Sequence, residues 1–143
     1  MAWKKILLEG DAGGTIPTPI CLTLFTDAAA KVWTNMPATL TEFIALAIHR
    51  SKLDLTGATQ ARLVVRQTVA GATNAKLKVQ YSTDESTWVD ICLVAVGTGV
   101  ATKAGAWTDI PAGAKADVFI RLTGIDGDGA ADPAFGLIVL QVK

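Results

Sequence analysis

Three aspartates in one glycine-rich loop are the residues whose types and spacing come closest to a chemical site. Asp126, Asp128 and Asp132 lie at positions i, i+2 and i+6 of the segment 126–133. A calcium ion prefers oxygen ligands and could collect carboxylates that lie this close together. The loop lacks the bidentate glutamate and the frame of an EF-hand. Two interpretations stay open: a structural calcium site, or a solvated turn whose aspartates bond to nearby backbone N–H groups.

A second acidic turn lies at 82–88, where the sequence reads Ser-Thr-Asp-Glu-Ser-Thr-Trp. This run is similar to the Asp-box hairpin of sialidases, but it is one residue shorter and lacks the glycine of that pattern. It also occurs once, whereas a propeller repeats its signature in each blade. We therefore expect the Asp84 side chain to organise the turn.

Nucleophilic and metal-binding side chains elsewhere are too few and too scattered for catalysis. His49 is the single histidine, and no serine or cysteine lies in a nucleophile-elbow pattern. Cys21 and Cys92 form no CxxC motif and no cluster with His49, which argues against a zinc site. We predict two reduced, buried thiols, although two strands could also bring them together as a disulfide. We expect no enzymatic activity and no cofactor other than the calcium considered above.

Four tryptophans, at positions 3, 33, 88 and 107, provide the largest aromatic surfaces. A tryptophan ring exposed at a loop end can stack on a sugar ring, and Trp107, close to the loop 97–105, is the candidate for ligand stacking. At least two of the four rings are expected in the core, because a domain of this size needs large apolar residues in its middle.

Composition excludes several classes of partner and points to an assembly. Acidic and basic residues number 13 each, and the basic ones are scattered, which argues against nucleic acid and against a polybasic membrane surface. Half of the residues are hydrophobic before the 13 glycines are counted, and 18% are charged. Average domains contain about 45–50% apolar residues with glycine included, and about 25% charged residues. Either the surface is unusually apolar or neighbouring copies cover part of it, and we expect a homo-oligomer or a larger assembly.

The elements that must position these residues are strands, and the clearest pair is the hairpin at Ala75–Cys92. Apolar residues at 75, 77, 79 and 81 alternate with polar residues at 76, 78, 80 and 82, which is the period of a half-buried strand. A run of turn formers follows, and Trp88, Val89 and Ile91 then begin a second apolar strand.

Shorter segments of the same kind follow one another along the chain. Patterning predicts strands at 2–8, 20–25, 61–69, 88–96, 106–110, 118–122 and 135–142, the last of them central or covered on its outer side. Val69 is placed on the same face as Leu63 and Val65. Turn formers at 70–74 are expected to close a hairpin from 61–69 into the 75–92 stretch, and 97–105 is expected to be a loop.

The segment Thr39–Arg50 fits two kinds of structure. Thr39 and Glu42 could form a capping box in front of an apolar helical stripe. Apolar residues at 44, 46 and 48 also alternate with their neighbours, and we favour a strand. The total of eight or nine short strands predicts an all-β fold, a single jelly-roll-like antiparallel β-sandwich with an extended N-terminal arm.

The domain boundary is placed at residue 19. Residues 1–19 are expected to form a short strand and an extended arm, and residues 20–143 the sandwich. The arm either lies over its own domain or reaches a neighbouring subunit and adds a strand there. Its helix-breaking residues, the candidates for an inter-subunit contact, are Gly10, Gly13, Gly14, Pro17 and Pro19.

The first residues do not read as a targeting segment. Lys4 and Lys5 precede three apolar residues, too few for the core of a signal peptide or for a membrane span. The product is therefore expected to stay in the cytosol, or to leave it inside an assembly or by lysis.

Several runs in the chain resemble a jelly-roll module of tailed-phage structural proteins. They are Trp33–Ala38, Lys52–Arg66, Lys78–Asp84, Thr87–Trp88, Ala114–Leu122 and Gly127–Gly136. The opening run Met1–Asp11 is similar to the start of many phage tail and fibre proteins. This resemblance implies a virion component with a galactose-binding-like or jelly-roll sandwich, and it implies no particular catalytic residue.

The leading hypothesis is a virion structural protein of a tailed phage that self-associates, with a capsid decoration (cement) protein favoured slightly over a tail component. Its expected partners are copies of itself and other virion proteins, such as a major capsid or tail protein. Its expected location is the virion, assembled in the host cytoplasm. Two alternatives stay open: a module that binds host glycans in receptor recognition, and a subunit of a non-phage extracellular filament.

Overall fold

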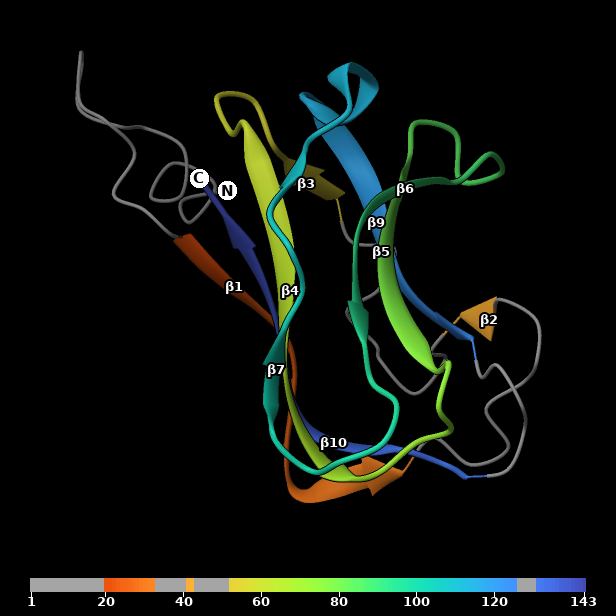
Figure 1. Ribbon diagram of the computed structural model, residues 1–143. Helices are drawn as coiled ribbons and strands as arrows, with labels where there is room; N and C mark the ends of the chain where they lie inside the picture. Colours follow the sequence, from red (N-terminus) through yellow and green to blue (C-terminus); the bar gives the residue numbers. More distant parts are fainter. Residues whose placement is uncertain (1–19, 33–40, 43–51, 126–130) are drawn as a thin grey trace.

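Ten strands build two antiparallel sheets in the computed structural model, which describes residues 20–32, 41–42, 52–125 and 131–143 (Figure 1). In chain order they are β1 (Ile20–Val32), β2 (Thr41–Glu42), β3 (Lys52–Asp54), β4 (Gln60–Val69), β5 (Lys76–Ser82), β6 (Val89–Ala95), β7 (Thr102–Ala104), β8 (Thr108–Asp109), β9 (Asp117–Ile125) and β10 (Ala134–Val142). A short 3-10 turn at Ala112–Ala114 is the one helical element of the described ranges. The prediction of an all-β sandwich is confirmed.

The strand order is that of a jelly roll. The first sheet runs β1-β10-β4-β7 with β8 also paired to β4, and the second runs β2-β9-β5-β6 with β3 also paired to β9. Because β2 and β3 follow one another along β9, and β7 and β8 along β4, each couple fills one strand position. Counted this way, the sheets have the orders 1-8-3-6 and 2-7-4-5, which two interlocked Greek keys produce. The described part has no helix long and apolar enough to span a membrane.

The core lies between the two sheets and is filled by alternate residues of the long strands. Leu77 and Val79 of β5 and Leu63 and Val65 of β4 are each 0% exposed, and Phe135 of β10 is the largest fully buried side chain. Burial of each such large apolar side chain contributes about 1.5–3 kcal/mol. β10 has β1 on one side and β4 on the other, so the prediction of a central last strand is also confirmed.

The predicted hairpin at 75–92 is present as β5 and β6, and it contains a bulge that the sequence did not reveal. Gln80 is opposite Asp90 and Val79 is opposite Cys92, so Ile91 is the extra residue of β6. Both Ile91 and Cys92 are buried as a result. The bulge therefore lets Asp90 face outward beside Gln80 while the following residues face the core.

The predicted hairpin from 61–69 into the 75–92 stretch is wrong, because its two strands belong to different sheets. β4 pairs with β10, β7 and β8, whereas β5 pairs with β6 and β9. Residues 70–75 instead cross between the sheets, and the Gly71 N–H donates to the Gly97 carbonyl oxygen over 3.3 Å. Turn formers indicate that the chain reverses, but they do not select the partner of the next strand.

The structure corrects two further predictions near β4, one for the loop 97–105 and one for Val69. The expected loop 97–105 contains β7, whose three residues pair with Val64–Arg66 and are too few to give an alternating signal. The buried face of β4 ends in Gln67, which is 1% exposed, whereas Val69 is 46% exposed at the end of the strand.

Only one of the two thiols is buried, which corrects the prediction for Cys21. Cys21 is exposed on β1 and lies opposite Gln141 on the outer side of the first sheet, because the alternate residues Ile20, Leu22 and Leu24 face the core. Cys92 is buried on β6 of the second sheet. Both thiols are free, so the alternative of a disulfide is excluded.

Several predictions fall outside the described residues. These are the strand and arm in 1–19 and most of the segment Thr39–Arg50, of which the structure describes Thr41 and Glu42 as β2.

Candidate functional site

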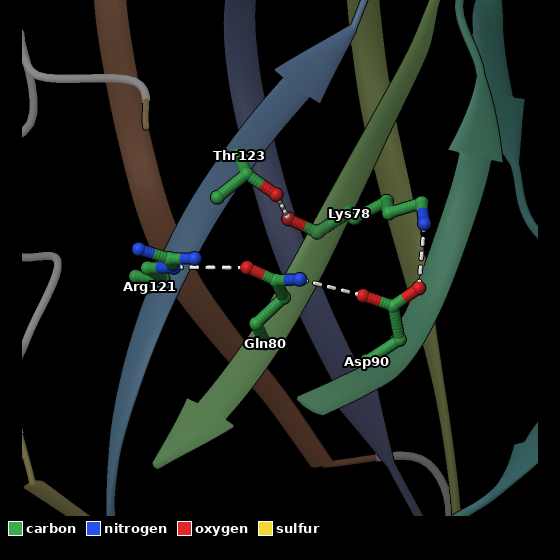
Figure 2. A network of polar contacts seen from close by, with 5 residues as sticks. All are labelled: Lys78, Gln80, Asp90, Arg121 and Thr123. Atoms are coloured by element: carbon green, nitrogen blue, oxygen red, sulfur yellow. Dashed lines mark hydrogen bonds and ion pairs between the residues drawn. The ribbon is translucent and has the colours of Figure 1, made fainter. Parts of the chain in front are cut away.

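The most connected polar group lies on the outer face of the sheet β2-β9-β5-β6 and consists of Lys78, Gln80, Asp90, Arg121 and Thr123 (Figure 2). We call these five residues the outer-face network. Arg121 Nε donates to Gln80 Oε1 over 2.9 Å, and Gln80 Nε2 donates to Asp90 Oδ1 over 2.7 Å. Lys78 Nζ forms an ion pair with Asp90 Oδ2, and Thr123 Oγ1 donates to the Lys78 carbonyl oxygen over 3.5 Å.

Strand register brings these side chains together. Gln80 of β5 lies opposite Arg121 of β9 on one side and opposite Asp90 of β6 on the other, so all three point to the same outer face. The Arg121 guanidinium also lies over the Trp88 ring, 4.3 Å from its centre. Because Gln80 is only 5% exposed, both ends of its amide need partners, and the two charged neighbours supply them.

The charges of the outer-face network decide the ionisation of its one acid. Burial acts to raise the pKa of the Asp90 carboxyl, but hydrogen bonds from Lys78 and Gln80 and the charges of Lys78 and Arg121 outweigh it. The pKa of Asp90 therefore lies below its ordinary value, and the carboxylate is ionised at neutral pH. Asp90 is thus held directly by Lys78 and, through Gln80, by Arg121, so the one acid of the network is already paired.

Trp107, the candidate for ligand stacking, lies beside a second group of polar residues at the first sheet. Arg62 lies 4.5 Å and Lys143 4.6 Å from the ring centre. Arg62 Nε also donates to Gln141 Oε1 over 2.7 Å. The ring is half-buried, and a stacking sugar would compete with these cations for the ring surface.

A third polar group holds the crossing between the sheets. Gln67 Nε2 donates to the carbonyl oxygens of Val69, Val96 and Gly97 over 2.9, 2.7 and 3.1 Å. Lys103 Nζ donates to the Gly97 carbonyl oxygen over 3.2 Å, and burial lowers the pKa of this ammonium. This group could not be predicted from the sequence, because a glutamine at an alternating position is typical of a surface residue.

The acidic turn is organised as expected. Asp84 Oδ1 accepts hydrogen bonds from the backbone N–H groups of Ser86 and Thr87, each over 2.8 Å, and from the Ser82 hydroxyl over 2.8 Å. These hydrogen bonds, the one from Thr87 first, hold the pKa of Asp84 well below its ordinary value of 3.8. Glu85 occupies a left-handed conformation with φ 61°, which completes the turn.

Replacing Asp84 with asparagine is expected to change the acid dependence of stability. Because the folded pKa is depressed, the charged form stabilises the fold above pH 3.8, and this contribution is lost as the pH falls toward the folded pKa. We therefore expect the difference in melting temperature between wild type and Asp84→Asn to decrease as the pH is lowered from about 7 to about 2. A difference in melting temperature that does not change with pH would contradict a stabilising role for the ionised Asp84 carboxylate.

The calcium interpretation stays a prediction. Asp132 is described and half-buried, whereas Asp126 and Asp128 lie outside the described residues. The helix-breaking residues of 1–19 lie outside them as well. In the ranges that the structure covers, no three His, Cys, Asp or Glu residues are grouped closely enough to hold a metal ion.

Comparisons of this chain with models of protein families, with curated proteins and with solved structures found no match.

Proposed function

We propose that this chain is a non-catalytic structural subunit that works by self-association. The observation that carries the proposal is the exposure of four large apolar side chains in a chain with few charges. Val69, Val89, Leu93 and Val100 are 46%, 44%, 42% and 61% exposed, in a chain of which only 18% is charged. Contacts between copies would cover these side chains, and each square ångström of apolar surface covered contributes about 25 cal/mol before the cost of lost freedom.

Repetition makes such contacts effective. A jelly roll presents two broad faces and two loop ends, and in a lattice each copy is held by several neighbours at once. Every further contact is then intramolecular, so weak contacts combine into a stable assembly. The bonded polar side chains around Gln80 and Trp107 would favour defined contacts over non-specific aggregation.

Within this class we propose a virion component of a tailed phage, with capsid decoration ahead of a tail role. The support is the resemblance of the sequence to phage jelly-roll modules, together with the jelly-roll strand order, which viral capsid domains also use. Electron microscopy of the purified protein tests the proposal. We expect repeated arrangements of subunits, such as rings, sheets or tubes, and a field of single small particles would count against it.

Glycan recognition is the second candidate, and the half-buried ring of Trp107 is the observation that favours it. The polar side chains of Arg62 and Lys143 lie near the ring and could bond to sugar hydroxyls. A glycan array separates the two functions. Specific binding that is lost in Trp107→Ala supports recognition, whereas multimerisation without any ligand supports the structural role.

A further inference from the structure

We propose that β1 is the self-association strand, and that its first residues pair antiparallel with the same residues of a second copy across a two-fold axis. This inference rests on the proposed self-association and names the surface responsible for it. The segment concerned is Ile20–Thr26, which we call the uncharged edge. Its occupant is the uncharged edge of the second copy.

β1 is an edge strand, since β10 is its one sheet neighbour in the part of the chain that the structure describes (Figure 1). Edge strands expose unpaired backbone groups and therefore bind further strands unless they are protected. Common protections are shortness, charge, proline, a bulge or a covering element. The four edges of this sandwich differ sharply in these respects.

The other three edges are protected. β2, β3, β7 and β8 have only two or three residues each. β6 is longer and, like β1, contains a bulge, but it also carries the charge of Asp90. Gly105 also lies against the Leu93 carbonyl of β6, in a contact too close for any larger residue. These edges are poor templates for another strand.

β1 has 13 residues, and its uncharged edge contains no charged residue, no proline and no glycine. The pairing with β10 is regular from Ile20 to Thr23 and shifts at Leu24. Cys21 and Thr23 are exposed there, and their small side chains leave the backbone accessible. The regular part of the uncharged edge is therefore Ile20–Thr23, and a bulge follows it at Leu24. An uncharged run of β-formers at an edge is the kind of strand that pairs with another.

A second copy fits this edge better than a charged partner does. In a two-fold antiparallel pair the strand meets itself, so any charge would lie close to the same charge. The uncharged edge avoids that repulsion. Ile20 and Leu22 pack against the core but are only partly buried. A second copy would cover both side chains, and the same two side chains of that copy would be covered in turn. The two first sheets would then continue into each other.

An axis at Leu22 defines the expected register. Leu22 then faces the partner's Leu22, and Cys21 faces the partner's Thr23. Antiparallel residues directly opposite one another are close enough for their side chains to attract or repel. This register makes the proposal testable with charges.

Thr23→Glu places a carboxylate on the uncharged edge. The wild-type protein should associate in sedimentation equilibrium, and this variant should associate roughly tenfold more weakly. The matched control is Thr102→Glu, an exposed threonine on β7 of the same sheet, which should associate like wild type. The double variant Cys21→Lys/Thr23→Glu should regain association, because lysine and glutamate then face each other twice across the axis.

Cys21 also provides a direct probe in the unaltered protein. Its thiol is exposed, whereas burial raises the pKa of Cys92 to about 12, so a maleimide should react with Cys21 alone in the folded chain. Labelling should slow as association proceeds, and melting curves of all variants would verify that they fold.

The outcomes separate the two proposals. Weakened association in Thr23→Glu alone, with recovery in the double variant, supports β1 pairing. Wild-type association that Thr23→Glu leaves unchanged, or that Thr102→Glu weakens equally, overturns β1 pairing and leaves the structural function standing. A wild-type protein that stays monomeric overturns the structural function, and β1 pairing with it.

Discussion

Replacing Gly105 with alanine is expected to destabilise the sandwich by about 3 kcal/mol and to lower the melting temperature by about 10 °C. Gly105 lies where β7 ends, and its N–H donates to the Leu63 carbonyl oxygen over 2.8 Å. A Cβ atom there would overlap the carbonyl oxygen of Leu93 and lie 3.1 Å from its carbonyl carbon. Both atoms belong to the backbone of β6, so relief requires the two edges to separate.

Gly99→Ala is the comparison for that measurement. No atom lies within 4 Å of a Cβ built at Gly99, but its φ of +93° is unfavourable for a side chain. We expect a smaller loss of about 1 kcal/mol from conformation alone. Thermal unfolding of both variants would test the account, and an equal or smaller loss for Gly105→Ala would show that the contact with Leu93 is relaxed at little cost.

Replacing Gln67 with leucine is expected to cost about 3 kcal/mol, although leucine is apolar and similar in size. The Gln67 side chain is 1% exposed, and its amide donates to three carbonyl oxygens at the crossing between the sheets. Leucine would remove this donor from all three acceptors. The Gly97 carbonyl oxygen would keep its hydrogen bonds from Gly71 and Lys103, so the expected loss comes from the carbonyl oxygens of Val69 and Val96. Gln67 Oε1 has no hydrogen-bond partner in the structure, so the donating nitrogen accounts for the expected loss.

The neighbouring residue gives the opposite prediction. Thr68 Oγ1 is buried without a hydrogen-bond partner, so Thr68→Val should leave stability unchanged or raise it by about 1 kcal/mol. Denaturant unfolding of both variants would measure the two effects on the same strand. A gain in Gln67→Leu, or a clear loss in Thr68→Val, would contradict this assignment of the buried polar groups.

The parts of the fold that follow from local patterning could be predicted from the sequence. Alternation at 75–82 identified β5, and the apolar run at 135–142 identified β10 as a central strand. The Asp84 turn was also predictable, because its hydrogen bonds join residues two or three positions apart. Each of these features depends on neighbours in the chain.

The remaining features depend on pairing between distant strands, which patterning does not encode. The chain from β4 to β5 crosses between sheets, because β4 pairs with β10 and β5 with β9. Cys21 and Cys92 looked alike in sequence, yet the alternation of β1 exposes one and the bulge of β6 buries the other. The buried Gln67 is missed for the same reason, since its carbonyl partners at 96 and 97 belong to another segment.

The same distinction between local patterning and strand pairing applies to the candidate site. The outer-face network was not predicted, because the meeting of Gln80, Asp90 and Arg121 requires the register of three strands. Alternation alone predicts that Lys78 and Gln80 point outward, but their partners on β6 and β9 follow only from the register. The predicted calcium site is untested, because Asp126 and Asp128 lie outside the described residues. The predicted stacking residue, Trp107, has Arg62 and Lys143 over its ring.

Sedimentation equilibrium of the wild-type protein over a wide range of concentrations tests the central claim, self-association, most directly. Exposed apolar side chains such as Leu93 and Val100 in a sparsely charged chain, together with the uncharged edge of β1, predict an average mass that rises from 14.9 kDa with concentration. The mass should then approach that of a defined oligomer or of a larger assembly. A mass that stays at 14.9 kDa up to the highest concentration reached would contradict the claim.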